Sequence, residues 1–210
     1  MIIFMGDLVD FYAISRFTKD PERALKMQDE LDEAKNLLQQ FRNIHPIIPM
    51  ILIRGNHEYR LQKYLWTKAP ELSGLRDLTV ESLLSLRHLN IMYEKSGRAN
   101  HRGIIFKHGD VVRKFAGYSA KGEFEKTGLS GVSGHTHRAA IYYQNNASGD
   151  YAWMECGCMC RLDQEYMEGE VPNWMQGWGV GYFSKNSPRF FLDFIPFVGG
   201  KAFYYGKEFF

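Results

Sequence analysis

The fold that we predict for this chain is decided by one stretch of sequence, Met50-Ile51-Leu52-Ile53-Arg54-Gly55-Asn56-His57-Glu58. It opens with a continuous apolar run, which indicates a short strand buried on both faces of a parallel sheet. The turn that follows carries an amide, an imidazole and a carboxylate. We therefore expect a buried strand that ends in a loop of side chains able to bind a metal ion or to take part in catalysis.

The same arrangement occurs near the start of the chain. Residues 1–5 are apolar and lead into Gly6-Asp7-Leu8-Val9-Asp10, so we predict a buried strand that delivers Asp7 to the loop at its end. Between the two strands, Asp20-Pro21 is typical of a helix start, and apolar residues then recur every three or four positions over 24–41. These elements predict a β-α-β beginning.

Further along, the pattern changes from alternating strands and helices to mostly strands. We predict helices at 58–68, about 79–88 and about 120–127. We predict strands at 91–95, 104–107, 129–133, 139–144, 151–160, 178–184, 189–197 and 201–205. The strand at 104–107 leads to His108, and the strand at 129–133 leads to Gly134-His135-Thr136-His137. The whole pattern indicates an α/β fold.

Length and composition favour a single domain over residues 1–210, because 45% hydrophobic residues are enough for one well-buried core. The 26 basic and 24 acidic residues leave a formal charge of +2, which gives no overall field to attract nucleic acid. The apolar start reaches Gly6-Asp7 too soon for a signal peptide or a membrane span. We expect a cytoplasmic protein with no membrane partner, and a homo-oligomer stays an open alternative.

Three cysteines, Cys156, Cys158 and Cys160, lie within five residues, an arrangement that suits a reducing cytosol better than a disulfide framework. On a strand, the alternation of side chains would place all three thiols on one face, as a soft-metal or redox site requires. The run has neither a Cys-x-x-Cys spacing nor a fourth ligand beside it. We therefore favour their interpretation as ordinary core residues of a strand.

Four motifs follow one another along the chain. They are Gly-Asp-x-x-Asp at 6–10, Gly-Asn-His-Glu at 55–58, a strand-end histidine at 108 and Gly-His-x-His at 134–137. In this order they resemble the calcineurin-like metallophosphoesterases. The motifs cover roughly residues 4–138, and the later strands are consistent with the second sheet of that family. The resemblance implies a four-layer α/β/β/α sandwich and a site for two divalent metal ions.

Carried over position by position, the resemblance implies five metal ligands. Asp7 would bridge the two ions. Asn56, His108 and His135 would complete the second site. His137 would belong to the first site. Carboxylate, amide and imidazole ligands suit Mn²⁺, Fe²⁺, Zn²⁺ and Ni²⁺; affinity order favours zinc and availability favours manganese, which is the ion that we expect.

The resemblance also implies roles in catalysis and substrate binding. His57 would stay off the metals and face the substrate phosphate, where it stabilises the transition state or protonates the leaving oxygen. Asp10 or Glu58 would orient His57 or a ligand, although a loop cap is an equal interpretation of Asp10. Apart from the resemblance, we interpret Arg138 as a contact to the substrate phosphate because it adjoins His137, with a solvated surface position as the alternative. Trp174 is a candidate wall for a base or sugar, with core packing as the alternative.

One motif of the family does not occur ahead of Asp7. Family members carry an Asp-x-His on a strand upstream of Gly-Asp, and it supplies two ligands of the first metal. We expect this sequence to belong to a longer protein, with the family's first strand and helix missing here; the alternative is a form with a weakened first site. A missing strand would leave an exposed edge in the sheet.

These observations predict a metal-dependent phosphodiesterase that acts on a nucleotide or nucleic-acid phosphodiester through attack by a metal-activated hydroxide. A first alternative is a phosphomonoesterase that acts on a small molecule or a phosphoprotein. Phe11-Tyr12 stands where the protein-phosphatase branch typically has Arg-Gly, which disfavours that branch. A second alternative is a weakly active or non-catalytic metal-binding domain, which a missing first strand would favour.

Overall fold

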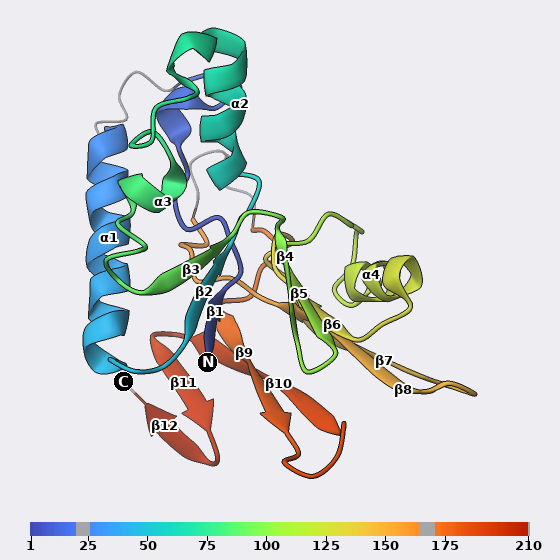
Figure 1. Cartoon of the computed structure of the whole chain (residues 1–210). Coiled ribbons are helices and arrows are strands. Elements are labelled where there is room, and N and C mark those ends of the chain that lie inside the picture. Colours follow the sequence, from blue (N-terminus) through green and yellow to red (C-terminus); the bar gives the residue numbers. More distant parts are fainter. Residues whose placement is uncertain (20–25, 164–170, 210) are drawn as a thin grey trace. The chain divides into compact units, whose positions relative to one another are not determined.

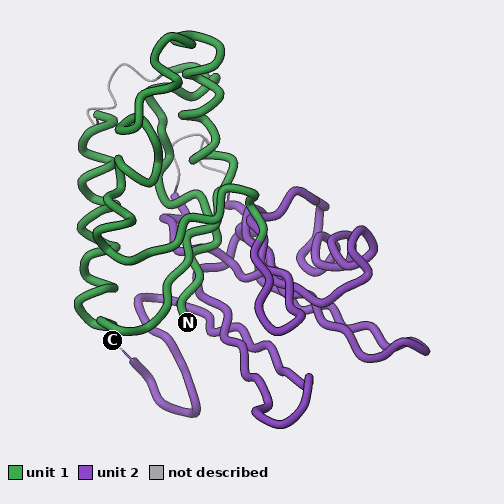
Figure 2. Tube along the Cα trace, in the orientation of Figure 1, with its two compact units in different colours: residues 1–98 green, residues 99–210 purple. Residues whose placement is uncertain are grey.

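The computed structural model describes residues 1–19, 26–163 and 171–209. The protein is mixed α/β, with several sheets and few helices, and it divides into two compact units, residues 1–98 and 99–210 (Figure 2). The single domain over residues 1–210 stays a prediction. No helix within the described ranges is both long and apolar enough to cross a membrane.

Unit 1, residues 1–98, is built on a three-stranded parallel sheet in the order β1-β2-β3 (Figure 1). The strands are β1 (Ile2–Phe4), β2 (Met50–Ile53) and β3 (Ile91–Glu94). Every residue of β2 is buried, as its apolar run predicted, because β2 is the central strand. β1 is also a strand as predicted, but its residues are only half-buried because it lies at the edge of this sheet.

Helices cover the sheet of unit 1 and close its core. They are α1 (Met27–Ile44), η1 (Tyr12–Ile14), α2 (Glu58–Lys68), η2 (Pro70–Leu72) and α3 (Val80–Leu83). The apolar stripe of α1, including Leu31 and Leu38, packs in one cluster with Leu52 of β2 and Leu61 of α2. α2 confirms the helix predicted at 58–68.

The predicted start of the first long helix, Asp20-Pro21, lies outside the described residues together with the rest of 20–25. The described part of α1 is preceded by Lys26, whose backbone N–H donates to the Asp29 carboxylate at 2.9 Å. Asp29 therefore satisfies one backbone donor at this end of the helix.

The helix predicted at about 79–88 is wrong in length. α3 ends at Leu83, and Ser85 then adopts a left-handed φ of 53°, which an α-helix does not accommodate. Thr79 caps the start of α3, because its hydroxyl accepts from the Ser82 N–H at 3.2 Å. Leu84 and Leu86 are fully buried, and both belong to the core cluster of this unit.

Unit 2, residues 99–210, contains a five-stranded sheet in the order β4-β5-β6-β8-β7, whose strand β4 begins at the boundary residue Arg98, and a four-stranded antiparallel sheet in the order β12-β11-β10-β9. The elements are β4 (Arg98–His101), β5 (Ile104–Lys107), α4 (Tyr118–Thr127), β6 (Gly131–Ser133), β7 (Ala139–Asn146), β8 (Gly149–Cys156), β9 (Gly177–Phe183), β10 (Phe190–Val198), β11 (Lys201–Tyr204) and β12 (Lys207–Phe209). β5, β7, β9, β10 and β11 confirm predicted strands, and α4 confirms the predicted helix near 120–127. β4 and β12 had not been predicted, and β6 is shorter than the predicted 129–133.

The strand predicted at 151–160 is wrong beyond Cys156, where β8 ends. Gly157 follows with a φ of 69°, and a Cβ built on it would lie 2.6 Å from the Met175 carbonyl oxygen and 2.8 Å from the Phe194 ring. Only glycine fits this turn. Cys158 and Cys160 therefore lie outside the strand, and their interpretation as core residues of a strand is wrong.

Candidate active-site residues in the two units

In unit 1, two of the motif loops meet at one end of the parallel sheet. β1 and β2 pair with Phe4 opposite Leu52, so the loops that follow both strands emerge at the same edge. The backbone N–H of His57 donates to the Asp7 carboxylate at 2.9 Å and joins the two loops. Asp7 adopts a left-handed φ of 56°, which is uncommon for a residue that carries a Cβ.

Gly55 allows this close approach of the loops. A Cβ built on it would lie 2.1 Å from Oδ1 of Asp7, 2.6 Å from the Asp7 backbone nitrogen and 2.8 Å from Oε2 of Glu58. Glycine at this position is therefore required by the packing of the two loops.

Replacing Gly55 by alanine should destabilise unit 1 by about 1–3 kcal/mol, because the added methyl group must push the Asp7 loop and Glu58 apart. Chemical denaturation of the wild-type and G55A chains measures the difference. Gly74→Ala is the matched control, since a Cβ there has no heavy atom within 4 Å. Equal unfolding midpoints for the G55A and G74A chains would contradict the proposed contact.

The His57 ring lies between two carboxylates. Its Nδ1 is 3.2 Å from Oδ1 of Asp10, and its Nε2 is 3.6 Å from Oδ2 of Asp7. Arg60 donates to the Asp10 carboxylate and, at 2.7 Å, to the Asp10 backbone oxygen. Burial alone would raise the pKa of Asp10, but the hydrogen bond from His57 and the charges of His57 and Arg60 lower it to about 2. Asp10 is thus a carboxylate aimed at His57 at neutral pH.

Glu58 connects the two loops by accepting hydrogen bonds from the backbone of both. Its side chain is 1% exposed, and its oxygens accept the backbone N–H groups of Asp7 at 2.9 Å, Leu8 at 2.7 Å and Gly55 at 2.8 Å, with Val9 at 3.4 Å. Burial and the nearby Asp7 carboxylate raise the pKa of Glu58, and the N–H donors oppose that rise. Glu58 positions the Asp7 loop rather than the His57 ring.

Asn56, the other predicted ligand of unit 1, is exposed in the turn before α2. The structure thus brings together Asp7, Asp10 and His57 in direct contact, with Asn56 next to His57 in the chain. Their roles as ligands and catalyst stay predictions.

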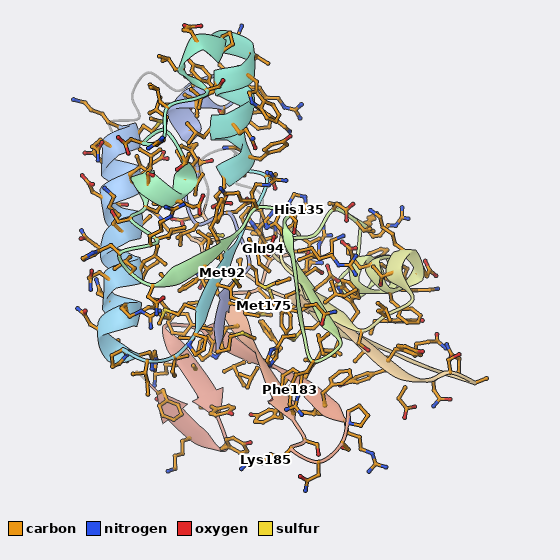
Figure 3. All side chains as sticks on the ribbon, in the orientation of Figure 1. Met92, Glu94, His135, Met175, Phe183 and Lys185 are labelled. Atoms are coloured by element: carbon orange, nitrogen blue, oxygen red, sulfur yellow. The ribbon has the colours of Figure 1, made fainter. Side chains whose placement is uncertain are left out.

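In unit 2, His108 and His135 face each other. β5 and β6 are parallel, with Lys107 opposite Ser133, so the residues after both strands lie side by side, and the Gly134 N–H donates to the His108 carbonyl at 2.9 Å. Nε2 of His108 and Nδ1 of His135 are 3.1 Å apart. Two imidazole nitrogens that converge in this way are able to share a metal ion or a proton. Figure 3 labels His135 in the loop after β6.

Two buried glutamates hold the loops of unit 2 as Glu58 does in unit 1. Glu123 of α4 is 1% exposed and accepts the backbone N–H groups of Asp110 at 3.0 Å and Val111 at 3.2 Å, just beyond His108. Glu155 of β8 is fully buried and accepts the Thr136 hydroxyl at 2.7 Å, inside the Gly-His-x-His motif. Each motif loop is therefore anchored by a buried carboxylate.

His137 contacts different side chains from those that the pair of His108 and His135 contacts. Its Nδ1 is 3.8 Å from Sγ of Cys160, and its ring packs edge-on against Trp174 with 4.3 Å between centroids. The ligand atoms of His137, Cys158 and Cys160 all lie within 4.8 Å of one another. The hydrogen bond from Cys158 and the nearby His137 lower the pKa of Cys160 to about 5.

Cys156 and Arg138, the predicted substrate contact, lie outside this group of three ligand residues. Burial raises the pKa of the Cys156 thiol to about 12, so the protonated thiol is favoured there. The Arg138 guanidinium donates to the Arg113 carbonyl, and its Nε is buried without a hydrogen-bond partner within the described ranges. This backbone contact engages part of the Arg138 side chain. Substrate binding by Arg138 stays a prediction.

Sequence reasoning missed the anchors of these loops. Glu123, Glu155 and Thr136 are separated in the chain from the groups that they bind, and no local pattern marks a glutamate as buried. The contact of Arg60 with Asp10 was likewise not predicted from the sequence. One local signal was present: glycine between Cys156 and Cys158 is typical of a break in a strand.

Comparison with known proteins adds no identification. No protein-family model matches the chain, and no curated protein matches it either.

Proposed function

We propose that this chain is a metal-dependent phosphoesterase that hydrolyses a phosphodiester of a nucleotide or nucleic acid, with the four-layer α/β/β/α sandwich that its motifs imply. The observation that carries the proposal is the position of His57 between the carboxylates of Asp7 and Asp10, in the loops that follow two adjacent parallel strands. An imidazole held in this way is suited to proton transfer to or from a bound substrate.

The proposed metal ligands are those that the resemblance implies: Asp7, Asn56, His108, His135 and His137. The oxygen and nitrogen donors of this set suit Mn²⁺, and the convergence of the His108 and His135 ring nitrogens at 3.1 Å fits a shared ion. Divalent ions, when bound, supply Lewis acidity toward the phosphate and a nucleophilic water at neutral pH.

The protein side chains supply the proton transfer. A carboxylate only accepts hydrogen bonds, so the contact with Asp10 requires the hydrogen of the ring to be on Nδ1 of His57. When the ring is doubly protonated, Nε2 also carries a hydrogen, which it gives to the leaving oxygen while Nδ1 keeps its own, or which it donates in a hydrogen bond to a charged phosphate oxygen. Arg60 keeps Asp10 ionised and in place, so it acts as a positioning residue.

The proposal predicts Mn²⁺-dependent hydrolysis of bis-p-nitrophenyl phosphate, faster than that of p-nitrophenyl phosphate, and its loss when the metal is chelated. Release of nitrophenolate from both esters, with and without added Mn²⁺, measures it. Faster turnover of the monoester would favour the phosphomonoesterase alternative. No turnover of either ester by a chain that binds Mn²⁺ would favour the non-catalytic metal-binding domain.

A further inference from the structure

The side-chain group formed by His137, Cys158 and Cys160 lies wholly within unit 2, and the phosphoesterase proposal uses only one of its members. We propose that this group, called here the thiol–imidazole cluster, is a binding site for a soft or borderline divalent cation, with Zn²⁺ as the natural occupant. The ligand atoms of the three residues already lie within 4.8 Å of one another.

The chemistry of the three donors selects the ion. Two cysteine sulfurs and one imidazole nitrogen are ligands that favour Zn²⁺ over Mn²⁺ or Mg²⁺, which prefer oxygen. Two thiolates would also balance the charge of a divalent ion. All three residues are half-buried, so an ion is able to reach them from solvent. Three protein ligands leave one tetrahedral position for water or another group.

The backbone around the thiol–imidazole cluster holds its members in place without a metal. Met175 donates its N–H to the His137 carbonyl at 2.9 Å, and its own carbonyl accepts the Cys158 N–H at 3.0 Å. The Gln176 side chain donates to the Cys160 carbonyl at 2.7 Å. Met175 is labelled in Figure 3, in the segment that precedes β9. One short segment therefore positions all three donors, which is the preorganisation that a metal site needs.

The turn at Gly157 explains why only two of the three cysteines take part. Because β8 ends at Cys156 and Gly157 has a left-handed φ, the chain leaves the strand before Cys158. Trp174 packs edge-on against the His137 ring and restricts its rotation. Cys156 stays in β8 and outside the group of converging ligand atoms, so it provides a control within the same run of sequence.

Titration of the metal-free, phosphine-reduced full chain with Co²⁺ tests the proposal. Cobalt bound by thiolates gives an intense charge-transfer band in the near ultraviolet, which oxygen and nitrogen ligands alone do not give. We expect this band, its displacement by Zn²⁺, and its loss in the C158S and C160S variants. Zinc affinity in each variant should fall by more than the roughly 10–100-fold that loss of an outer-shell partner costs.

The C156S variant is the matched control and should keep both the band and the zinc affinity. A thiolate band that is absent from the wild-type chain, or that persists in both C158S and C160S, would overturn the proposal. Circular dichroism of the metal-free variants shows whether each remains folded; if a serine variant unfolds, Cys160→Ala provides the same test. The readout does not depend on hydrolysis, so this inference and the proposed phosphoesterase activity fail separately.

Discussion

Replacing His57 by alanine should slow Mn²⁺-dependent diester hydrolysis by about 10²–10⁴-fold, the usual contribution of a general acid–base group. The expectation rests on the contacts of the ring, whose two nitrogens face Asp10 and Asp7. Alanine keeps the backbone N–H that binds the Asp7 carboxylate, so the two loops should stay joined while the imidazole is lost. The loss should therefore fall on kcat more than on metal binding.

Steady-state hydrolysis of bis-p-nitrophenyl phosphate by the H57A chain, at saturating Mn²⁺, measures this effect. His88→Ala is a suitable control, because His88 is an exposed histidine of the same unit that no motif surrounds. Its rate should match that of the wild-type chain. If H57A and wild-type rates are equal while the Mn²⁺ dependence persists, His57 has no part in proton transfer and the assigned chemistry is wrong.

Replacing Glu58 by alanine should lower the free energy of unfolding by more than about 3 kcal/mol, a large share of the 5–15 kcal/mol typical of a domain. The carboxylate is the acceptor for the N–H groups of Asp7, Leu8 and Gly55, and its removal leaves buried donors unpaired. Urea denaturation of the metal-free chains measures the change. Glu71→Ala, an exposed glutamate of the same unit, should stay within about 0.5 kcal/mol of the wild-type value.

The isosteric variant E58Q sharpens this prediction. Oε1 of Glu58 accepts from Leu8 and Oε2 accepts from Asp7 and Gly55, so either orientation of the amide sets its NH₂ group against backbone donors. We expect faster hydrogen exchange at these amides in E58Q than in the wild-type chain. Unchanged exchange, together with an unchanged unfolding midpoint, would show that Glu58 does not anchor the Asp7 loop.

The elements that the sequence predicted correctly are those that depend on the pattern of neighbouring residues in the chain. The apolar run over 50–53 is a buried central strand, and the residues after it form α2 where the pattern predicted it. In the same way, His108 and the Gly134 motif follow β5 and β6 as expected. A continuous apolar run predicts such a strand because successive side chains point to opposite faces of the sheet, and both faces are covered where the run is buried.

The parts that escaped prediction depend on partners distant in the chain. Glu155 binds Thr136 across 19 positions, and nothing near Glu155 in the sequence indicates that it is fully buried. The break at Gly157 is imposed by the Met175 carbonyl and the Phe194 ring, which the sequence alone does not bring there. The cysteine spacing predicted a continuous strand because the alternation of side chains is visible in the sequence. The groups that end the strand at Gly157 come from distant residues and are not visible there.

Three of the five predicted metal ligands have a backbone that suits glycine better than themselves. Asp7, His135 and His137 have φ values of 56°, 65° and 58°, a region that costs a residue with a Cβ about 1–2 kcal/mol. At His135 and His137, glycine would relieve this strain, and the donor atom would be lost with it. Heat resistance and metal retention thus favour different residues at these positions. A redesign guided by stability alone would remove the candidate ligands first.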